Sequence, residues 1–308
     1  MSKRPYVVCV TPSYNRHQFL DNLIYQYQYQ DYPKDRIEYI ILDDTPGEPF
    51  SSEAMKKEKR LTYIHEKEKL LIPHKRNKLN KLALDKGADI IVYMDDDDYY
   101  PPDRVKHAVT KLQSSRALIA ASTELYIYDM ISKSVFKVGP YHANHGTAGT
   151  FAFKKEYLAN HYFNEDTTIN TGEEKFFTND FTEPMVQLNP WSVILCFNTG
   201  INTFDKRKIL DDTKKKQVNI KQLIKDKKIR KFFMDINDNT EYLALPEKST
   251  KKIQVTNRQL EFLNEYKTLP ENKQVSLFKS IHNNKPLSEE DTDKLKMLDL
   301  LINKKIIL

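Results

Sequence analysis

The apolar run Ile90-Ile91-Val92-Tyr93-Met94 leads directly into four consecutive aspartates, Asp95 to Asp98. An apolar run that ends in acidic residues predicts a buried strand followed by a loop. Adjacent carboxylates repel one another, and a bound cation relieves that repulsion. Hard oxygen ligands suit Mg²⁺, Mn²⁺ or Ca²⁺ rather than Zn²⁺, and open α/β sheets bind their ligands at the carboxyl ends of strands. The stretch therefore predicts a divalent-metal site at the edge of an α/β sheet.

Strand-like and helix-like segments alternate around this stretch. Apolar runs at 6–11, 37–42 and 61–64 predict three more strands, and 117–128 predicts a further extended segment. Helical spacing of apolar residues over 19–27 and 76–86, and again after Pro101-Pro102, predicts helices between them. This alternation indicates an α/β fold with a mostly parallel central sheet.

The basic residues of the chain are concentrated in one segment. The 308 residues carry a net charge of +6, whereas 206–231 alone holds 12 Lys+Arg against 3 Asp+Glu, a net +9, so the remainder carries −3. We expect a catalytic domain over 1–205 and a basic, mainly helical C-terminal extension over 206–308. The basic segment has three interpretations: a solvated helix face, a membrane-surface helix, or a contact with an anionic acceptor or nucleic acid.

Composition also favours a reduced, aqueous compartment. No apolar run approaches the length of a membrane span, and the basic N-terminus is followed by an apolar stretch too short for a signal peptide. The two cysteines, Cys9 and Cys196, lie in apolar runs and are expected to be buried thiols. The expected location is the cytoplasm.

Four polar motifs follow one another along the chain. They are Thr11-Pro12-Ser13-Tyr14-Asn15-Arg16 after the first strand, Asp43-Asp44 after the second, Asp95 to Asp98 after the fourth, and Gly172-Glu173-Glu174 later. Their order and spacing resemble the nucleotide-sugar domain of family 2 glycosyltransferases with the GT-A fold, over roughly 4–205. The Asp-rich motif followed by Tyr-x-Pro also resembles glycosyltransferases of large DNA viruses, for which the compartment would be the host cytoplasm.

The resemblance implies a pocket for the nucleotide base. In the family the first-strand motif lines that pocket, and its tyrosine can stack on a uracil. The second aspartate of the Asp-Asp pair reads the uracil N3–H, a role that falls on Asp44 with Asp43 as the alternative. The first-strand residues that correspond are Thr11, Pro12, Tyr14 and Asn15.

The resemblance also implies contacts for the diphosphate and the metal. Arg76-Asn77 matches an Arg-Asn pair from which the guanidinium can reach a phosphate. Asp97 is expected to bind Mn²⁺ or Mg²⁺ directly, with Asp95 as a second ligand. Asp95 and Asp96 are further expected to reach the ribose or bound water.

The catalytic base of the family is the second acid of a Glu-Asp pair. Here it is Glu174, and because its side chain is longer than the usual aspartate, Glu173 stays open as the alternative. One base in a single in-line displacement gives inversion at the anomeric carbon. The metal-binding histidine that many members carry after the base is missing, and Asn198 or Asn202 is left as a weak substitute.

Simpler structural roles are open for each motif. Asp95 to Asp98 can be a solvated loop, and Asp43-Asp44 can open a turn. Glu173-Glu174 can be a first-turn helix pair, and Arg76 can be an exposed helix charge.

The function we expect is a metal-dependent inverting glycosyltransferase that moves a sugar from a UDP-sugar to a glycan or other hydroxyl acceptor. One alternative is a nucleotidyltransferase, although Pro12-Ser13-Tyr14-Asn15 lacks the glycine-rich phosphate loop usual in those enzymes. The other is a non-catalytic binding protein that recruits nucleic acid through 206–231, for which binding would weaken steeply with salt. A nucleic-acid partner is the less favoured of these expectations, and membrane-surface contact through 206–231 stays possible.

Overall fold

The structure is a computed structural model of the chain, and it describes residues 4–130, 132–166, 172–199, 206, 210, 215–216 and 219–238. The chain divides into two compact units, Met1–Leu245 and Pro246–Leu308, and every described residue belongs to the first. The helical spacings noted in the last part of the chain, and most of the predicted extension over 206–308, lie outside the described residues. The division at 205 therefore stays a prediction.

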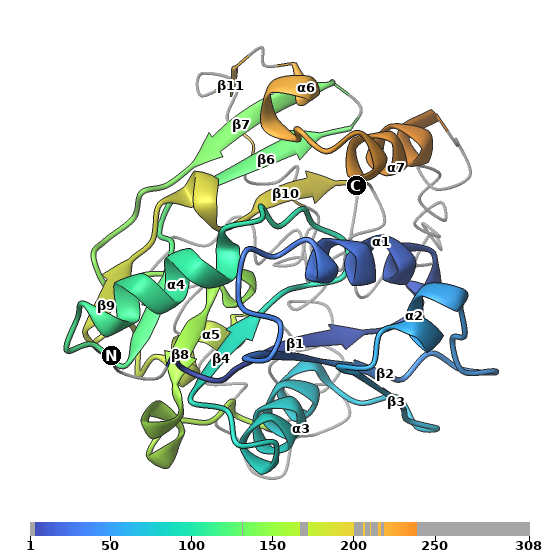
Figure 1. The fold of residues 1–308 in the computed structure, drawn as a ribbon. Coiled ribbons are helices and arrows are strands. Elements are labelled where there is room, and N and C mark those ends of the chain that lie inside the picture. Colours follow the sequence, from blue (N-terminus) through green and yellow to red (C-terminus); the bar gives the residue numbers. More distant parts are fainter. Residues whose placement is uncertain are drawn as a thin grey trace, which may run out of the picture. The chain divides into compact units, whose positions relative to one another are not determined.

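Seven strands form the larger sheet, in the order β3-β2-β1-β4-β8-β5-β9 (Figure 1). Its first four members are parallel: β1 (Val7–Ser13), β2 (Ile37–Asp43), β3 (Leu61–His65) and β4 (Ile90–Tyr93). β8 (Ala152–Lys154) runs antiparallel to β4 and to β5 (Ile119–Ala121), and β9 (Met185–Gln187) is parallel to β5. The mostly parallel sheet expected from the alternation of strands and helices is confirmed.

Residues along β1 alternate between the two faces of this sheet, as the two-residue period of a strand requires. Val7 and Cys9 join the apolar cluster that contains α1 (His17–Gln28) and α4 (Arg104–Gln113). Val8 and Val10 join the cluster that contains α3 (Ile72–Asp85). Figure 1 shows α1 and α4 over one face of the sheet and α3 over the other. The central strands are thus buried on both faces, which is why they read as continuous apolar runs.

A smaller sheet has the order β10-β6-β7-β11. Its strands are β6 (Leu125–Asp129), β7 (Ser134–Val138), β10 (Leu195–Asn198) and β11 (Lys215–Lys216). The single extended segment predicted over 117–128 was wrong, because β5 and β6 belong to different sheets. The chain turns between them, where the Ser122 hydroxyl donates to the carbonyl of Glu124 (2.6 Å) and the amide of Thr123 donates to Gln187 (2.8 Å).

Two helices of the basic segment cover the smaller sheet, α6 (Ile220–Leu223) and α7 (Lys227–Asp238). Phe233 of α7 is fully buried and stacks on Phe197 of β10, with ring centroids 3.9 Å apart. The lysines Lys227, Lys228 and Lys231 stay exposed. This part of the segment therefore matches the solvated-face interpretation: its apolar side is buried within the protein.

The remaining short elements connect these layers. None of the helices in the described part of the chain is long and apolar enough to cross a membrane. The short elements are α2 (Glu53–Lys57), α5 (Glu173–Phe177) and the 3₁₀ turns η1 (Ala148–Thr150), η2 (Lys155–Ala159) and η3 (Pro190–Ser192).

Candidate active site

The polar motifs meet at the carboxyl edge of the parallel strands. Ser13 at the end of β1 pairs in register with Asp43 at the end of β2. The Ser13 hydroxyl donates to Asp96 (2.8 Å), just past the end of β4. Residues from the ends of three neighbouring strands therefore lie together here. The solvated-loop interpretation of Asp95 to Asp98 does not hold, since Asp96, Asp97 and Asp98 are buried.

Arg16 is the main partner of the two middle aspartates. Its Nη1 lies 3.1 Å from Asp96 Oδ1 and also contacts Asp97 Oδ2 directly. Burial opposes the charge on the guanidinium, but the two carboxylates outweigh it and raise the pKa of Arg16. Burial raises the pKa of Asp96 to about 7, although the charge of Arg16 opposes that rise.

Asp98 is turned toward the smaller sheet. Its Oδ1 accepts from the backbone amide of Phe197 (2.7 Å) and from Lys206 Nζ (3.1 Å), and Lys206 also donates to the carbonyl of Phe197 (2.9 Å). Burial raises the pKa of Asp98 to about 6 even with this cation beside it. Asp98 thus anchors β10 to the acidic cluster.

Asp95 is the most open of the four aspartates. One of its oxygens, Oδ1, is buried without a hydrogen-bond partner and lies 3.7 Å from Arg76 Nη1. On the other side, a Cβ placed on Gly149 would come within 2.7 Å of Asp95 Oδ2, so a side chain at residue 149 would require the carboxylate to shift. Burial raises the pKa of Asp95.

The Asp43-Asp44 pair is buried, and each carboxylate accepts hydrogen bonds within the protein. Asp43 accepts from Tyr63 (2.6 Å) and Thr45, and His17 Nε2 lies 2.7 Å away. Burial alone would raise the pKa of Asp43, but these hydrogen bonds outweigh it and lower the pKa. The pair does more than open a turn, because it ties β2 to β3 and to the start of α1.

Lys75 of α3 neutralises Asp44. Its Nζ donates to Asp44 Oδ1 and to the carbonyl of Ser13 (2.8 Å), while the other oxygen of Asp44 accepts from the amide of Leu70 (2.6 Å). Burial lowers the pKa of Lys75, and the hydrogen bond to Asp44 opposes that change. Lys75 and Lys69 also lie over the ring of Tyr14, at 5.4 and 4.2 Å from its centroid.

The other first-strand residues differ in how they face the site. Thr11 is fully buried, and its hydroxyl contacts the carbonyl of Met94 and Tyr39 (2.8 Å), so it supports the sheet from within. Pro12 is buried in β1. Asn15 has a positive φ of 54°, which turns the chain after β1, and its amide donates to Thr45 (2.7 Å).

Arg76 joins the acidic cluster to the second acidic motif. Its Nε lies 3.4 Å from Glu173 Oε1, while its Nη1 faces Asp95. The guanidinium also lies over the ring of Tyr93, 5.0 Å from the centroid. Arg76 is only 5% exposed, so the interpretation as an exposed helix charge was wrong. Its Nε and Nη1 are buried without hydrogen-bond partners, which leaves donors available at this position.

Asn77 is engaged elsewhere. Its side chain exchanges two hydrogen bonds of 2.8 Å with the backbone of Phe163 and donates to Glu165 (2.8 Å). It therefore fixes the loop after η2 to α3.

Glu173 and Glu174 occupy the first turn of α5, as the helix interpretation expected, and they are also at the site. Glu173 faces Arg76, whereas Glu174 Oε1 accepts from the amide of Ala148 in η1 (3.1 Å). Burial and the neighbouring charge of Glu173 raise the pKa of Glu174. The two glutamates are thus held differently, one by a cation and one by a backbone amide.

The carboxylates of the acidic cluster are the ligand type that a divalent cation prefers. In this structure they instead contact the protein's own cations, such as Arg16 and Lys206. The carboxylates are hard oxygen donors, and Asp95 Oδ1 is a buried oxygen without a hydrogen-bond partner. In the described part of the chain, no three acidic, histidine or cysteine side chains converge to hold a metal ion. Asn198 donates to Asp129 (2.8 Å), and Asn202 lies outside the described residues.

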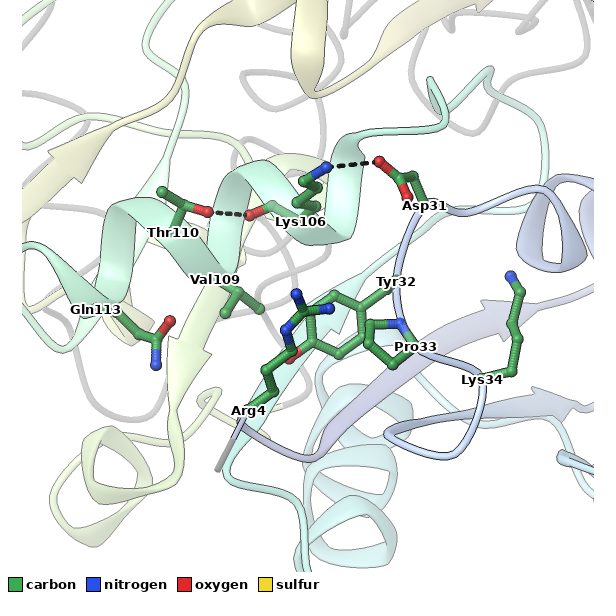
Figure 2. A pocket seen from close by; sticks show the side chains of 9 residues that line it. All are labelled: Arg4, Asp31, Tyr32, Pro33, Lys34, Lys106, Val109, Thr110 and Gln113. Atoms are coloured by element: carbon green, nitrogen blue, oxygen red, sulfur yellow. Dashed lines mark hydrogen bonds and ion pairs between the residues drawn. The ribbon is translucent and has the colours of Figure 1, made fainter. Parts of the chain in front are cut away.

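A cavity of about 520 Å³ lies away from these residues, at the amino end of the strands (Figure 2). Arg4, which precedes β1, lines it together with Tyr32, which precedes β2, and Val109 of α4. Lys106 and Asp31 also line the cavity, and they form an ion pair in which Lys106 Nζ lies 2.8 Å from Asp31 Oδ2. Because ligands of open α/β sheets bind at the carboxyl edge, the acidic cluster and not this cavity is the candidate site.

Sequence reasoning missed three cations of the site: Arg16, Lys75 and Lys206. Arg16 directly follows the first-strand motif, and Lys75 directly precedes Arg76, so both were close to recognised positions. Lys206 is 108 residues from Asp98, and no spacing in the sequence indicates that pair.

Comparison with known proteins identifies the chain's relatives. The family model described as glycosyl transferase family 2 matches residues 8–181, more than half of the chain. No curated protein matches the sequence.

Two solved structures show a similar fold at low identity. S. aureus TarS 1–349 in complex with UDP has 15% identity and a TM-score of 0.48, over 62% of this chain and 60% of that chain. The mannosyltransferase PcManGT from Pyrobaculum calidifontis, in complex with GDP-Man and Mn²⁺, has 16% identity and a TM-score of 0.47, over 98% of this chain and 86% of that chain. This chain thus spans about 60% of the length of the TarS fragment.

Proposed function

The chain belongs to glycosyl transferase family 2, and on that premise we propose that it transfers a sugar from a nucleotide-sugar donor, a UDP-sugar, to an acceptor hydroxyl with inversion. One observation carries the proposal: Arg76 lies between Asp95 of the acidic cluster (3.7 Å) and Glu173 of the second acidic motif (3.4 Å). Two motifs 78 residues apart in the sequence therefore enclose one position, where a donor and an acceptor can meet.

Glu174 is the proposed catalytic base. Glu173 is held by Arg76, whereas Glu174 has a backbone amide as its partner and a raised pKa, which favours proton uptake. In the proposed step Glu174 takes the proton of the acceptor hydroxyl, and the acceptor oxygen attacks the anomeric carbon. The bond from that carbon to the diphosphate oxygen breaks on the opposite side, and the nucleoside diphosphate leaves. A single displacement of this kind inverts the configuration.

The leaving diphosphate needs positive charge around it. The buried Nε and Nη1 of Arg76 have no hydrogen-bond partners and can donate to phosphate oxygens. A divalent cation, Mn²⁺ or Mg²⁺, would be held by Asp97 and Asp95 and would stabilise the charge that develops on the leaving group. Asp96 would stay with Ser13 and Arg16, facing the ribose or bound water.

The uracil pocket is proposed at the ends of β1 and β2. The ring of Tyr14, with Lys69 and Lys75 over it, offers a face for stacking. A carboxylate has about four acceptor positions, and Asp44 uses two of them for Lys75 and Leu70, so it keeps capacity for the uracil N3–H. Thr11 supports this pocket from within the sheet, through its buried contact with Tyr39. Asn77 acts on it indirectly, by holding the loop after η2 to α3.

The test is release of nucleoside diphosphate from a panel of UDP-, GDP- and dTDP-sugars, with Mn²⁺ or Mg²⁺ and with chelator. We expect release from a UDP-sugar that needs the metal, and strong loss of release in Glu174→Gln with donor binding unchanged. Glu156→Gln, on the exposed surface of η2, is the matched control. Absence of release from every sugar nucleotide, by a protein that is folded, would contradict the proposal. Equal release in Glu174→Gln would move the base to Glu173.

A further inference from the structure

The 3₁₀ turn η1 contacts the helix that carries the proposed base. The amide of Ala148, the first residue of η1, donates to Glu174 Oε1 (3.1 Å). Phe151, which directly follows η1, stacks on Phe177 of α5, with ring centroids 5.7 Å apart. A polar contact at its start and an apolar contact at its end therefore join this turn to α5.

Tyr100 joins the same turn to the acidic cluster. This tyrosine is 1% exposed, and its hydroxyl accepts from the amide of Asp95 (2.5 Å) and donates to the carbonyl of Gly149 (3.4 Å). Its own amide donates to Oε1 of Gln26 (2.7 Å), a fully buried residue of α1. One hydroxyl thus connects the backbone of the acidic cluster with the backbone of η1.

Arg104, the first residue of α4, holds the end of η1 from inside the protein. It is fully buried, and its Nη2 donates to the carbonyls of Thr150 (2.8 Å) and Phe151 (2.9 Å). The same nitrogen lies 3.3 Å from the carbonyl of Tyr93, at the end of β4. Arg104 therefore connects η1 with the strand that leads into the acidic cluster.

The charge of Arg104 has no counterion among the described residues. The acceptors of its guanidinium there are the three carbonyls, and its Nε and Nη1 are buried without hydrogen-bond partners. Burial lowers the pKa of Arg104 to about 10, so the guanidinium stays charged at neutral pH. A buried charge without a counterion opposes folding, and proteins carry such costs mainly at functional sites.

From these contacts we propose that Tyr100 and Arg104 are positioning residues for sugar transfer, and this inference rests on the proposed function. Together they bind three consecutive carbonyls at the end of η1 and hold the turn so that its first amide meets Glu174. The base is thereby kept at a fixed place relative to the acidic cluster. Both residues act through η1 and not on the substrates, so their loss should lower kcat more than donor affinity, because a small misplacement of a catalytic group slows the chemical step strongly.

The experiment measures release of nucleoside diphosphate by the full chain and separates kcat from the donor KM. In Tyr100→Phe, which removes only the hydroxyl, we expect kcat to fall about tenfold or more while the donor KM changes by about twofold or less. Burial raises the pKa of Glu174, and the amide of Ala148 opposes that rise, so a loosened η1 should also move the acid limb of the kcat profile to higher pH.

Tyr27→Phe is the matched control. It also removes a buried hydroxyl that donates to a backbone carbonyl, that of Ile37 (3.2 Å), but it lies away from η1. We expect its kcat and pH profile to equal those of the wild type. Equal losses of kcat in Tyr27→Phe and Tyr100→Phe would overturn the proposal, as would a wild-type kcat in Tyr100→Phe.

Hydrogen exchange of the ligand-free protein, followed by NMR, separates the possible failures. The amide of Ala148 should exchange faster than in the wild type both in Tyr100→Phe and in Arg104→Lys, which keeps the charge but loses the planar fork. Unchanged protection of this amide in both variants would overturn the proposal. If the wild type releases no diphosphate from any sugar nucleotide while Ala148 loses protection in the variants, the proposed function fails and the anchoring of η1 stands.

Discussion

Replacement of Lys75 by methionine should destabilise the protein strongly. Asp44 is 1% exposed, and Lys75 Nζ supplies both its counterion and the donor for the carbonyl of Ser13. Methionine keeps the apolar length of the side chain but removes the charge and the donor. In Lys75→Met the carboxylate of Asp44 keeps one hydrogen bond, from the amide of Leu70. The change therefore tests whether a buried ion pair holds the ends of β1 and β2 to α3.

The size of the effect follows from the burial. Removal of one partner from a buried pair costs about 3–5 kcal/mol, because an uncompensated charge is left inside the protein. That is a large part of a typical stability of about 5–15 kcal/mol. Lys78, on the same helix, provides the comparison: its pair with Glu66 is as short (2.6 Å), but its side chain is 43% exposed. An exposed pair of this kind contributes about 0–1 kcal/mol.

The assay is urea unfolding of the wild type, Lys75→Met and Lys78→Met, followed by circular dichroism. With a slope of about 1–3 kcal/mol/M, the midpoint of Lys75→Met should fall by about 1 M or more, whereas that of Lys78→Met should move little. Equal midpoints for the two variants would refute the reasoning, since they would show that Asp44 and Lys75 are solvated or dispensable.

Three further changes have defined outcomes. Phe233→Ala, which removes the ring stacked on Phe197, should lower the free energy of unfolding by about 3–5 kcal/mol in chemical denaturation. Met234→Ala, at an exposed position of the same helix, should lower it little. Equal losses of stability in the two variants would mean that α7 does not pack on β10. Burial lowers the pKa of His107, whose Nε2 accepts from the amide of Asn189 (3.0 Å). The unfolded chain therefore binds a proton more readily, so stability should decrease as pH falls from 7 to 5, and less so in His107→Gln; identical pH profiles would contradict this. Asp97→Ala should abolish the metal dependence of UDP binding measured by calorimetry, and a metal effect that persists would remove Asp97 as the ligand.

The central parallel strands β1, β2 and β4 could be predicted because they are buried on both faces. Continuous apolar runs such as 90–94 are typical of strands covered on both faces, and the acidic residues after them mark the strand ends. The break at Ser122 could not be predicted in the same way. Residues on both sides of it are equally suited to a strand, and the turn depends on bonds to Glu124 and Gln187, the second of which is distant in the sequence.

The carboxylates of the candidate site could be predicted from the sequence, and the cations that pair with them could not. Carboxylates that follow strands are brought together by the sheet itself, so their motif order is sufficient. The cations come from different elements: Arg16 precedes α1, Lys75 lies within α3, and Lys206 is far along the chain. Their pairing depends on how those elements pack, and a lysine or arginine on a helix gives no sign of which carboxylate it meets. The protein's own cations can therefore neutralise clustered aspartates as a metal ion would.

The central claim is that this family 2 glycosyltransferase binds a nucleotide-sugar donor through a metal at the acidic cluster. The most direct measurement is the stability of the full chain with UDP, GDP or dTDP, each with and without Mn²⁺, in the wild type and in Asp97→Ala. At a hundredfold excess over its Kd, UDP with Mn²⁺ should raise the free energy of unfolding of the wild type by about 2.7 kcal/mol. Neither UDP without metal nor UDP with Mn²⁺ in the variant should reach that value. The absence of stabilisation by any nucleoside diphosphate, with or without Mn²⁺, would contradict the account.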